Sequence, residues 1–388
     1  MLPTLAAAAL ALAPVPTGVV DASNDFAADL YGAIGAKPGN VVFSPASIST
    51  ALAMTYAGAR GDTAAQMVKT MHLPGPPFDV HAGYGALLGR LTSTAAGDPE
   101  LRVANRLFGQ KGWAIEAPFL SLAKDKYGAP VDLLDFKASE AARSTINGWV
   151  AGQTNDRIKD LIPAGVLDAD TRLVLTNAIF FKGKWANAFD KKATTDQPFH
   201  AAKASPKVPT MRSTMTVGYG DYVDAQVLEL PYLGKDPAHA ASMIVVLPKK
   251  KDGLGALGGK RTFELLRSKA GATKVDVSLP RFKVTQPTDL NEILKGLGMV
   301  DAFKQGKADF SGIHKTEKLF ISRALHKAFV QVDEEGTEAA AATAIVVATE
   351  GAMPHPTPTF QADHPFAWAI RDKSTGALLF VGRVDDPS

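Results

Sequence analysis

The stretch that most limits what this chain can fold into lies near its end, at residues 333–351. It begins with the acidic Asp333–Glu335; small side chains then predominate, and mainly β-branched side chains follow in Ile345–Thr349. The preceding residues, Ala328–Val332, alternate like a strand, and three prolines soon after the stretch leave few regular hydrogen-bonding options. Two interpretations remain open at this point. The stretch is either a short alanine-rich surface helix, or an exposed loop that later becomes a central strand, with Gly336 as its hinge.

Composition limits the class of protein. The chain has 388 residues, 46% of them hydrophobic and 21% charged, which is typical of a globular protein long enough for a large core. A net charge of +3 gives no indication of a nucleic-acid partner or of an anionic membrane surface. The absence of cysteine excludes disulfides, thiol catalysis and cysteine-ligated metals.

The N-terminal residues 1–20 are apolar and rich in alanine. In length and apolarity they resemble the core of a signal peptide, with a cleavage-like Ala11-Leu12-Ala13, although the positively charged start is missing. The run is too short to span a membrane, and no later run is long enough. We expect residues 1–20 to be a signal peptide or a disordered segment, residues 21–388 to form one domain, and the protein to be secreted or extracytoplasmic rather than cytoplasmic.

Hydrophobic periodicity indicates helices mainly in the first part of the chain and strands mainly in the last. Ser23 is expected to start a helix that places Phe26, Leu30 and Ile34 on one face. The continuous apolar run Leu173–Phe181 predicts a strand that is covered on both faces. No regular alternation of strand and helix is present, so the fold class is α+β with large antiparallel or mixed sheets.

Catalytic signatures are missing from the chain. There is no Gly-x-Ser-x-Gly elbow, no His-Glu-x-x-His, no Walker loop and no dinucleotide fingerprint. The eight histidines show no metal-like spacing. Only His326 stands out, because it lies just upstream of residues 333–351. The chain is therefore predicted not to be an enzyme, and to need neither a metal nor a cofactor.

Six motifs, in a fixed order, carry a resemblance to a known family. They are Asn40–Ile48, Leu175–Trp185, Leu279–Phe282, His326–Ala328, the stretch 333–351, and a C-terminal set that begins at Ala362–Phe366 and ends at Phe380–Val384. Over residues 21–388 the chain resembles the serpin family.

The resemblance implies a fold of three β-sheets, with a large mixed central sheet, about nine helices and an exposed reactive-centre loop over about residues 335–359. It implies a suicide inhibitor of serine, and sometimes cysteine, proteases. The protease cuts the loop and forms an acyl-enzyme. The loop then inserts as a new central strand, and the protease is held in a covalent complex. We expect a monomer that forms loop–sheet polymers when destabilised. The helix expected near Val80–Leu91 has no basic face, so no glycosaminoglycan cofactor is expected.

The hinge of the loop is the part that would insert first. Its residues are Glu335, Gly336, Thr337, Glu338, Ala339, Ala340, Ala341 and Ala342. The alternating positions Thr337, Ala339, Ala341 and Thr343 carry no charge, whereas Glu338 falls on the opposite phase and can face water. This pattern suits insertion and predicts an inhibitor. The alternative is a non-inhibitory serpin that acts as a chaperone, carrier or storage protein.

Two clusters carry over from the family to matching positions. The shutter, where the central strands part, comprises Ser44, Ser47, Asn177 and His326. The breach, where the loop first enters, comprises Trp185, Arg281 and Glu334. Arg281 and Glu334 carry opposite charges on strands expected to be neighbours, so we expect an ion pair. If that pair is exposed, it contributes only about 0–1 kcal/mol.

The bond that the protease cuts follows from the family's spacing. The reactive residue usually lies sixteen positions after the glutamate that matches Glu334, which gives the bond between Glu350 and Gly351. Glutamate is an unusual residue for the specificity pockets of trypsin-, chymotrypsin- or elastase-like proteases, however. The preceding residues, Ile345–Thr349, suit an elastase-like or subtilisin-like cleft. Cuts after Ala348, Thr349 or Met353 therefore remain rivals.

Overall fold

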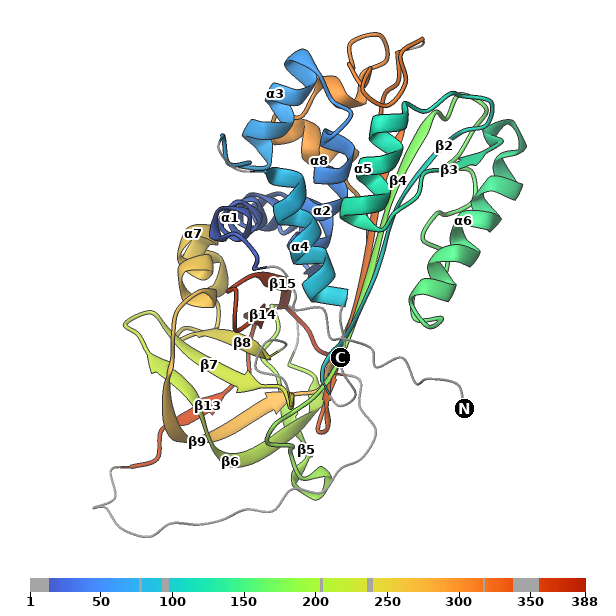
Figure 1. Ribbon diagram of the computed structural model, residues 1–388. Coiled ribbons are helices and arrows are strands. Elements are labelled where there is room, and N and C mark those ends of the chain that lie inside the picture. Colours follow the sequence, from blue (N-terminus) through green and yellow to red (C-terminus); the bar gives the residue numbers. More distant parts are fainter. Residues whose placement is uncertain are drawn as a thin grey trace, which may run out of the picture.

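The fold was obtained as a computed structural model that describes residues 14–76, 79–92, 98–202, 205–235, 240–316, 318–337 and 356–388 (Figure 1). Its α-helices are α1 Thr17–Ile34, α2 Pro45–Tyr56, α3 Gly61–Thr70, α4 Val80–Thr92, α5 Ala117–Tyr127, α6 Ser139–Gln153, α7 Leu254–Leu266 and α8 Asn291–Gly296. Its strands are β1 Val41–Phe43, β2 Glu100–Gln110, β3 Asp132–Leu134, β4 Leu173–Lys184, β5 Thr195–Pro198, β6 Lys207–Asp221, β7 Ala225–Pro231, β8 Ala241–Pro248, β9 Gly271–Pro280, β10 Phe282–Asp289, β11 Arg323–Asp333, β12 Gly336–Thr337, β13 Thr359–Gln361, β14 Phe366–Asp372 and β15 Leu378–Val384.

Hydrogen bonding joins the described strands into two sheets. One has six strands in the order β10-β11-β12-β4-β2-β3, and it is mixed because β11 runs parallel to β4. The other has nine strands in the order β1-β15-β14-β8-β7-β6-β9-β13, with β5 paired to β6. The predicted α+β class and the mixed central sheet are confirmed. The expected third sheet is not separate in the described residues, because the 15-residue strand β6 pairs with β5 at its start and β7 at its end.

Strand β4 has a continuous apolar sequence because both of its faces are covered. Alternate residues point to opposite faces, and two different hydrophobic clusters cover them. Val174, Ala178 and Phe180 pack with Ile146 and Val150 of α6. Leu175, Ile179 and Phe181 belong instead to the main core, together with residues of α2 and β15. Figure 1 shows α6 on one side of the long strands and α2, α4 and α5 on the other. The predicted doubly covered strand is confirmed.

Helix α1 begins earlier than the sequence indicated. It starts at Thr17, not at Ser23, because Val19 and Val20 extend its buried face into the core. Ser23 is fully buried inside the helix and its hydroxyl has no hydrogen-bond partner, so it caps nothing. The prediction of export concerns residues 1–20, of which residues 1–13 lie outside the described residues and residues 17–20 form the start of α1. In the part of the chain that the structure describes, no helix has both the length and the apolarity to cross a membrane.

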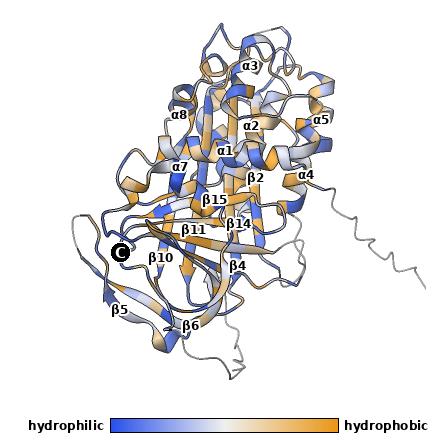
Figure 2. Ribbon diagram, turned by 90° about the vertical axis from the view of Figure 1, so that its left-hand side faces the viewer, coloured by the Kyte–Doolittle hydropathy of each residue, from blue (hydrophilic) through white to orange (hydrophobic). Residues whose placement is uncertain are grey.

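The feature that positions the functional site is the seam between β4 and β11. The two strands pair directly from Arg323 opposite Val174 to Phe329 opposite Phe180. Beyond that point they part, and the two residues of β12 lie between them, antiparallel to both. Figure 2 shows much of β11 and β14 in orange, the colour of hydrophobic residues. The sheet is therefore closed along most of its length and has begun to open at one end.

Candidate functional site

The open end of the seam holds the beginning of the predicted hinge. Within β12, Thr337 lies opposite Val332 of β11 and Gly183 of β4. Two further main-chain hydrogen bonds fasten the preceding residues: Trp185 N donates to Glu335 O at 2.9 Å, and Phe189 N donates to Glu334 O at 2.9 Å. Gly336 and Thr337 are thus already part of the sheet, and Glu335 lies in the turn that leads into them. The other predicted residues of the loop lie outside the described residues, and their roles stay predictions: Glu338, Ala339, Ala340, Ala341, Ala342, Ala348, Thr349, Glu350, Gly351 and Met353.

Gly336 is required at its place in β12 for two reasons. Its φ of +149° belongs to a region that favours glycine. A Cβ at this position would also lie 2.0 Å from Gly183 O, which is well inside a van der Waals contact. Glycine at position 336 therefore lets the hinge approach β4 closely enough to pair with it.

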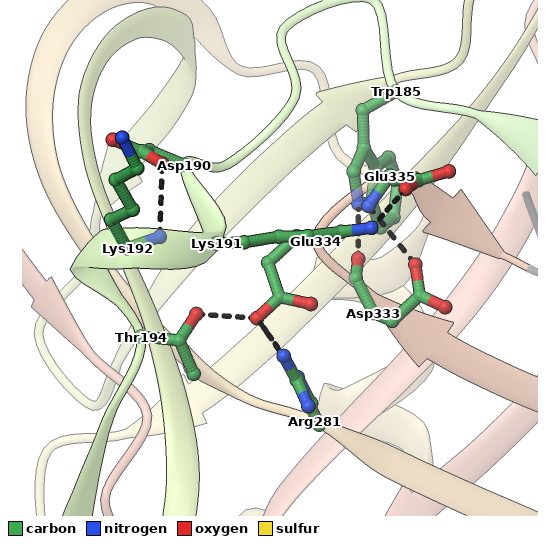
Figure 3. Close-up of polar contacts among 9 residues, drawn as sticks. All are labelled: Trp185, Asp190, Lys191, Lys192, Thr194, Arg281, Asp333, Glu334 and Glu335. Carbon is green, nitrogen blue, oxygen red and sulfur yellow. Dashed lines mark hydrogen bonds and ion pairs between the residues drawn. The ribbon is translucent and has the colours of Figure 1, made fainter. Parts of the chain in front are cut away.

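The three residues predicted as the breach lie together beside β12 (Figure 3). Arg281 donates to Glu334 Oε1 from Nε at 2.8 Å and from Nη2 at 2.5 Å. Trp185 Nε1 donates to Asp333 O at 2.9 Å. The geometry thus joins the ion pair and the tryptophan to the last residues of β11, while their role in loop insertion stays a prediction.

The ion pair is buried on one side only. The side chain of Glu334 is 2% exposed and that of Arg281 is 43% exposed. Burial acts to raise the pKa of Glu334, but hydrogen bonds from Arg281 and Thr194 outweigh it, so the pKa lies below its ordinary value. The pair is therefore not the exposed kind that contributes almost nothing. The buried carboxylate of Glu334 would be unfavourable without the hydrogen bonds from Arg281 and Thr194.

Sequence reasoning missed a short turn that supports the breach. Thr194 donates its hydroxyl hydrogen to Glu334 Oε1, and Lys191 forms an ion pair with Glu335 (Figure 3). Both belong to the turn that follows β4, at the 3-10 helix Lys191–Ala193. No pattern in the sequence links this turn to a hinge some 140 residues later. The carboxylates of Glu334 in the breach and Glu335 in the hinge are thus held from the same turn.

The four predicted shutter residues also meet, beneath the closed part of the seam. Ser44 caps helix α2 by accepting from Ser47 N at 3.2 Å, and its own N–H donates to His326 Nε2 at 3.2 Å. Asn177 Oδ1 pairs with His326 Nδ1, and Asn177 Nδ2 donates to Ser47 Oγ at 2.7 Å. The network therefore ties α2 to both β4 and β11, the strands that must part for a loop to insert.

A fifth residue, Asn105 of β2, completes this network and was missed. Ser47 Oγ donates to Asn105 Oδ1 at 3.2 Å, and Asn177 Nδ2 donates to the same oxygen at 2.5 Å. Asn105 is half-buried between Ala104 and Arg106 in the strand. Arg102 and Arg106 lie in the same strand, so no local pattern distinguishes Asn105 in the sequence. Asn105 carries the network across to the neighbouring strand of the same sheet.

His326 is fully buried at the centre of the shutter network, and its neutral form fits the hydrogen bonds. Nε2 accepts from Ser44 N–H, so Nδ1 carries the proton and donates to Asn177 Oδ1. Burial lowers the pKa of His326 from 6.5 to about 3. A proton on Nε2 would remove the acceptor that Ser44 uses.

We expect acid to destabilise the protein through His326. Between about pH 6.5 and about pH 3 the unfolded chain binds a proton at this position and the folded chain does not. The free energy of unfolding therefore falls as the pH drops through that window, with a slope that approaches about 1.4 kcal/mol per pH unit. Urea unfolding between pH 5 and 6.5, above most carboxyl titrations, measures this slope. The His326→Gln variant, which cannot titrate, should show a flatter profile; equal slopes would contradict the assignment.

No group of three or more His, Asp and Glu side chains that could hold a metal ion occurs among the described residues.

Comparison with known proteins agrees with this geometry. A family model described as "Serpin (serine protease inhibitor)" matches residues 21–387. Leukocyte elastase inhibitor from Bos taurus is 42% identical over 381 residues, which cover 94% of this chain and 98% of the relative. Serpin B8 from Homo sapiens is 40% identical over 377 residues, which cover 95% of this chain and 99% of the relative.

Solved structures show the same fold. Serpin48 of the insect Tenebrio molitor superposes with a TM-score of 0.85 at 33% identity, over 95% of this chain and 98% of that one. Arabidopsis AtSerpin1 in its native stressed conformation gives a TM-score of 0.85 at 28% identity, over 97% and 100% of the two chains. The family model spans nearly the whole chain, and the chain therefore belongs to the serpin family of serine protease inhibitors.

Proposed function

We propose that this serpin traps its target by the suicide-substrate route. The protease cuts the reactive-centre loop, becomes acylated by it, and is carried away as the loop inserts between β4 and β11. The observation that carries the proposal is the position of β12. Its two residues occupy the entrance of the seam, in the alignment that an inserting strand would continue.

Backbone hydrogen bonding supplies a reason for insertion to proceed. Unpaired N–H and C=O groups in an opened sheet must find partners. Each loop residue that follows Thr337 into the seam would offer such partners to both β4 and β11. A loop from Gly336 to Glu350 has 15 residues and would reach about 50 Å as a strand, at roughly 3.3 Å per residue. Insertion would thus move an attached protease by a distance comparable to its own size.

We propose an elastase-like target, with a subtilisin-like protease as the second choice. The β-branched and small residues of Ile345–Thr349 suit a shallow apolar cleft. Relatives at 41–42% identity carry the name leukocyte elastase inhibitor. The bond after Glu350 and the bonds after Ala348, Thr349 and Met353 are the candidates that an experiment must separate.

Incubation with a panel of serine proteases tests the mechanism and the target together. We expect a complex with an elastase-like protease that survives SDS, because the acyl bond is covalent. Mass spectrometry of the released C-terminal peptide gives the cut bond. A chymotrypsin-like and a trypsin-like protease serve as controls, with weaker or no complex expected. Cleavage by every protease without any complex would contradict the proposal.

The thermal stability of the cleaved protein separates an inhibitor from a carrier or storage serpin. A loop that inserts completes the central sheet, so the cleaved chain should unfold tens of degrees higher than the intact chain. Circular dichroism melts before and after proteolysis measure this difference. An unchanged melting temperature after clean cleavage would favour the non-inhibitory alternative.

A further inference from the structure

One side chain beside the seam contacts the hinge and belongs to neither predicted cluster. Tyr232 follows β7 and forms an isolated bridge with Trp185. Its N–H donates to Ala241 O at 2.9 Å, which fixes the backbone. Its ring stacks on Trp185 with centroids 4.6 Å apart and 14° between the planes, and it meets Phe181 edge-on at 4.9 Å.

The ring of Tyr232 is held on its remaining side by the backbone of β4. A Cβ on Gly183 would lie 2.8 Å from Tyr232 Cδ1, so glycine at this position makes room for the ring. Tyr232 is 4% exposed. With the backbone bonded and the ring enclosed, the hydroxyl is held at one place.

The hydroxyl of Tyr232 contacts the hinge. The hydroxyls of Tyr232 and Thr337 lie 2.7 Å apart, and Thr337 is fully buried. Burial raises the pKa of Tyr232 well above its ordinary value, so the phenol keeps its proton. Two buried hydroxyls thus satisfy one another across the junction of the two sheets. Neither could lose its partner without leaving a buried polar group unpaired.

We propose that Tyr232 is a positioning residue for loop insertion, whose hydroxyl holds Thr337 in the register that the inserting strand must keep. Register matters here because side chains alternate between the faces of a sheet. A slip by one residue would bring the carboxyl of Glu338 to the buried position that Thr337 holds. The inference rests on the proposed inhibitory function. It assigns Tyr232 a part in setting the fraction of cleaved molecules that insert the loop and trap the protease instead of releasing it.

The Tyr232→Phe variant tests the role of the hydroxyl while keeping the ring stack on Trp185. We expect two changes. The peptide that covers Glu335–Thr337 should exchange its amide hydrogens faster in the uncleaved protein. The stoichiometry of inhibition should also rise, with the ratio of cleaved serpin to complex increasing about fivefold, because losing a hydrogen bond of typical net strength slows insertion by that order. The rate constant of association should change by less than about twofold, since the loop that the protease meets is unaltered.

A matched control separates positioning from ordinary packing. Tyr219→Phe also deletes a hydroxyl between neighbouring strands, and this hydroxyl accepts from Gln226 Nε2 at 2.9 Å instead of contacting the hinge. This variant should leave both the stoichiometry and the exchange of the hinge peptide unchanged. If Tyr232→Phe lowers the melting temperature but behaves like the control in both assays, its role is packing alone and the proposal is wrong.

The partner hydroxyl gives a second, independent test. Thr337→Val removes the other half of the pair, and Thr337→Ser keeps it. We expect Thr337→Val to match Tyr232→Phe, Thr337→Ser to match the wild type, and the double variant Tyr232→Phe/Thr337→Val to be no worse than either single change. Additive effects would overturn the proposal. If the wild type forms no complex, the proposed function fails, yet hydrogen exchange at the hinge still decides whether Tyr232 positions Thr337.

Discussion

Replacing Thr337 with arginine should convert the protein from an inhibitor into a substrate of its target protease. Thr337 is fully buried between β11 and β4, with its hydroxyl on Tyr232. The Tyr232 hydroxyl offers a guanidinium at this position no negative charge. Leaving a charge unpaired in such surroundings costs several kcal/mol. Insertion would stall at its first step while the acyl-enzyme hydrolyses. We expect the stoichiometry of inhibition to rise at least tenfold, with cleaved serpin as the main product.

The conservative variant Thr337→Ser is the control for this change. It keeps the small size and the hydroxyl, so it should trap protease like the wild type. Gel electrophoresis of reaction products at several molar ratios measures the division between complex and cleaved chain. If the arginine variant still gives SDS-stable complexes at a molar ratio of serpin to protease near one, the side chain at position 337 does not need to be buried during trapping. The insertion argument would then fail.

Replacing Glu334 with lysine should destabilise the intact protein and promote polymers. Glu334 Oε1 accepts from Arg281 and from Thr194, and its side chain is 2% exposed. A lysine would place a second cation against Arg281. Breaking a buried ion pair typically costs about 3–5 kcal/mol, and the half-exposed Arg281 can recover part of this by turning to solvent. We expect a melting temperature lower by several degrees and oligomers after gentle heating, which size-exclusion chromatography would detect.

The neighbouring ion pair supplies the matched control for this second change. Lys191 pairs with Glu335, but its side chain is 62% exposed, so the Lys191→Met variant should shift the melting temperature by little. The comparison separates the loss of a buried carboxylate from the loss of a surface charge at the same hinge. A Glu334→Lys protein that unfolds like the wild type and stays monomeric on heating would show that the breach pair does not hold the sheet closed.

Most elements of the fold could be predicted from hydrophobic spacing alone. Phe26, Leu30 and Ile34 share the buried face of α1, and the doubly covered strand is β4. Spacing worked there because burial on one or both faces sets which residues can be apolar. It failed at the start of α1, because Ser23 looks like a cap in sequence while Val19 and Val20 carry the helix further into the core.

Only part of the candidate site could be predicted from the sequence. Arg281 and Glu334 could be paired in advance because the resemblance to serpins implies that they are neighbours and because their charges are opposite. Thr194, Asn105 and Tyr232 could not, since each acts on a residue that is 58 or more positions away and none has an unusual local pattern. Uncharged polar groups find partners through tertiary geometry, and their sequence neighbours say little about which partner that will be.

The sequence by itself determined what residues 333–351 can tolerate. Small, uncharged side chains on alternate positions permit a strand to slide into a packed sheet. Only the tertiary structure decided where the sheet ends and the loop begins. It places Gly336 and Thr337 already between β4 and β11, with Tyr232 on the threonine hydroxyl. The physical reason is that side-chain pattern specifies which residues can be buried, whereas strand pairing depends on which backbone groups meet, and those groups come from segments about 150 residues apart in the chain.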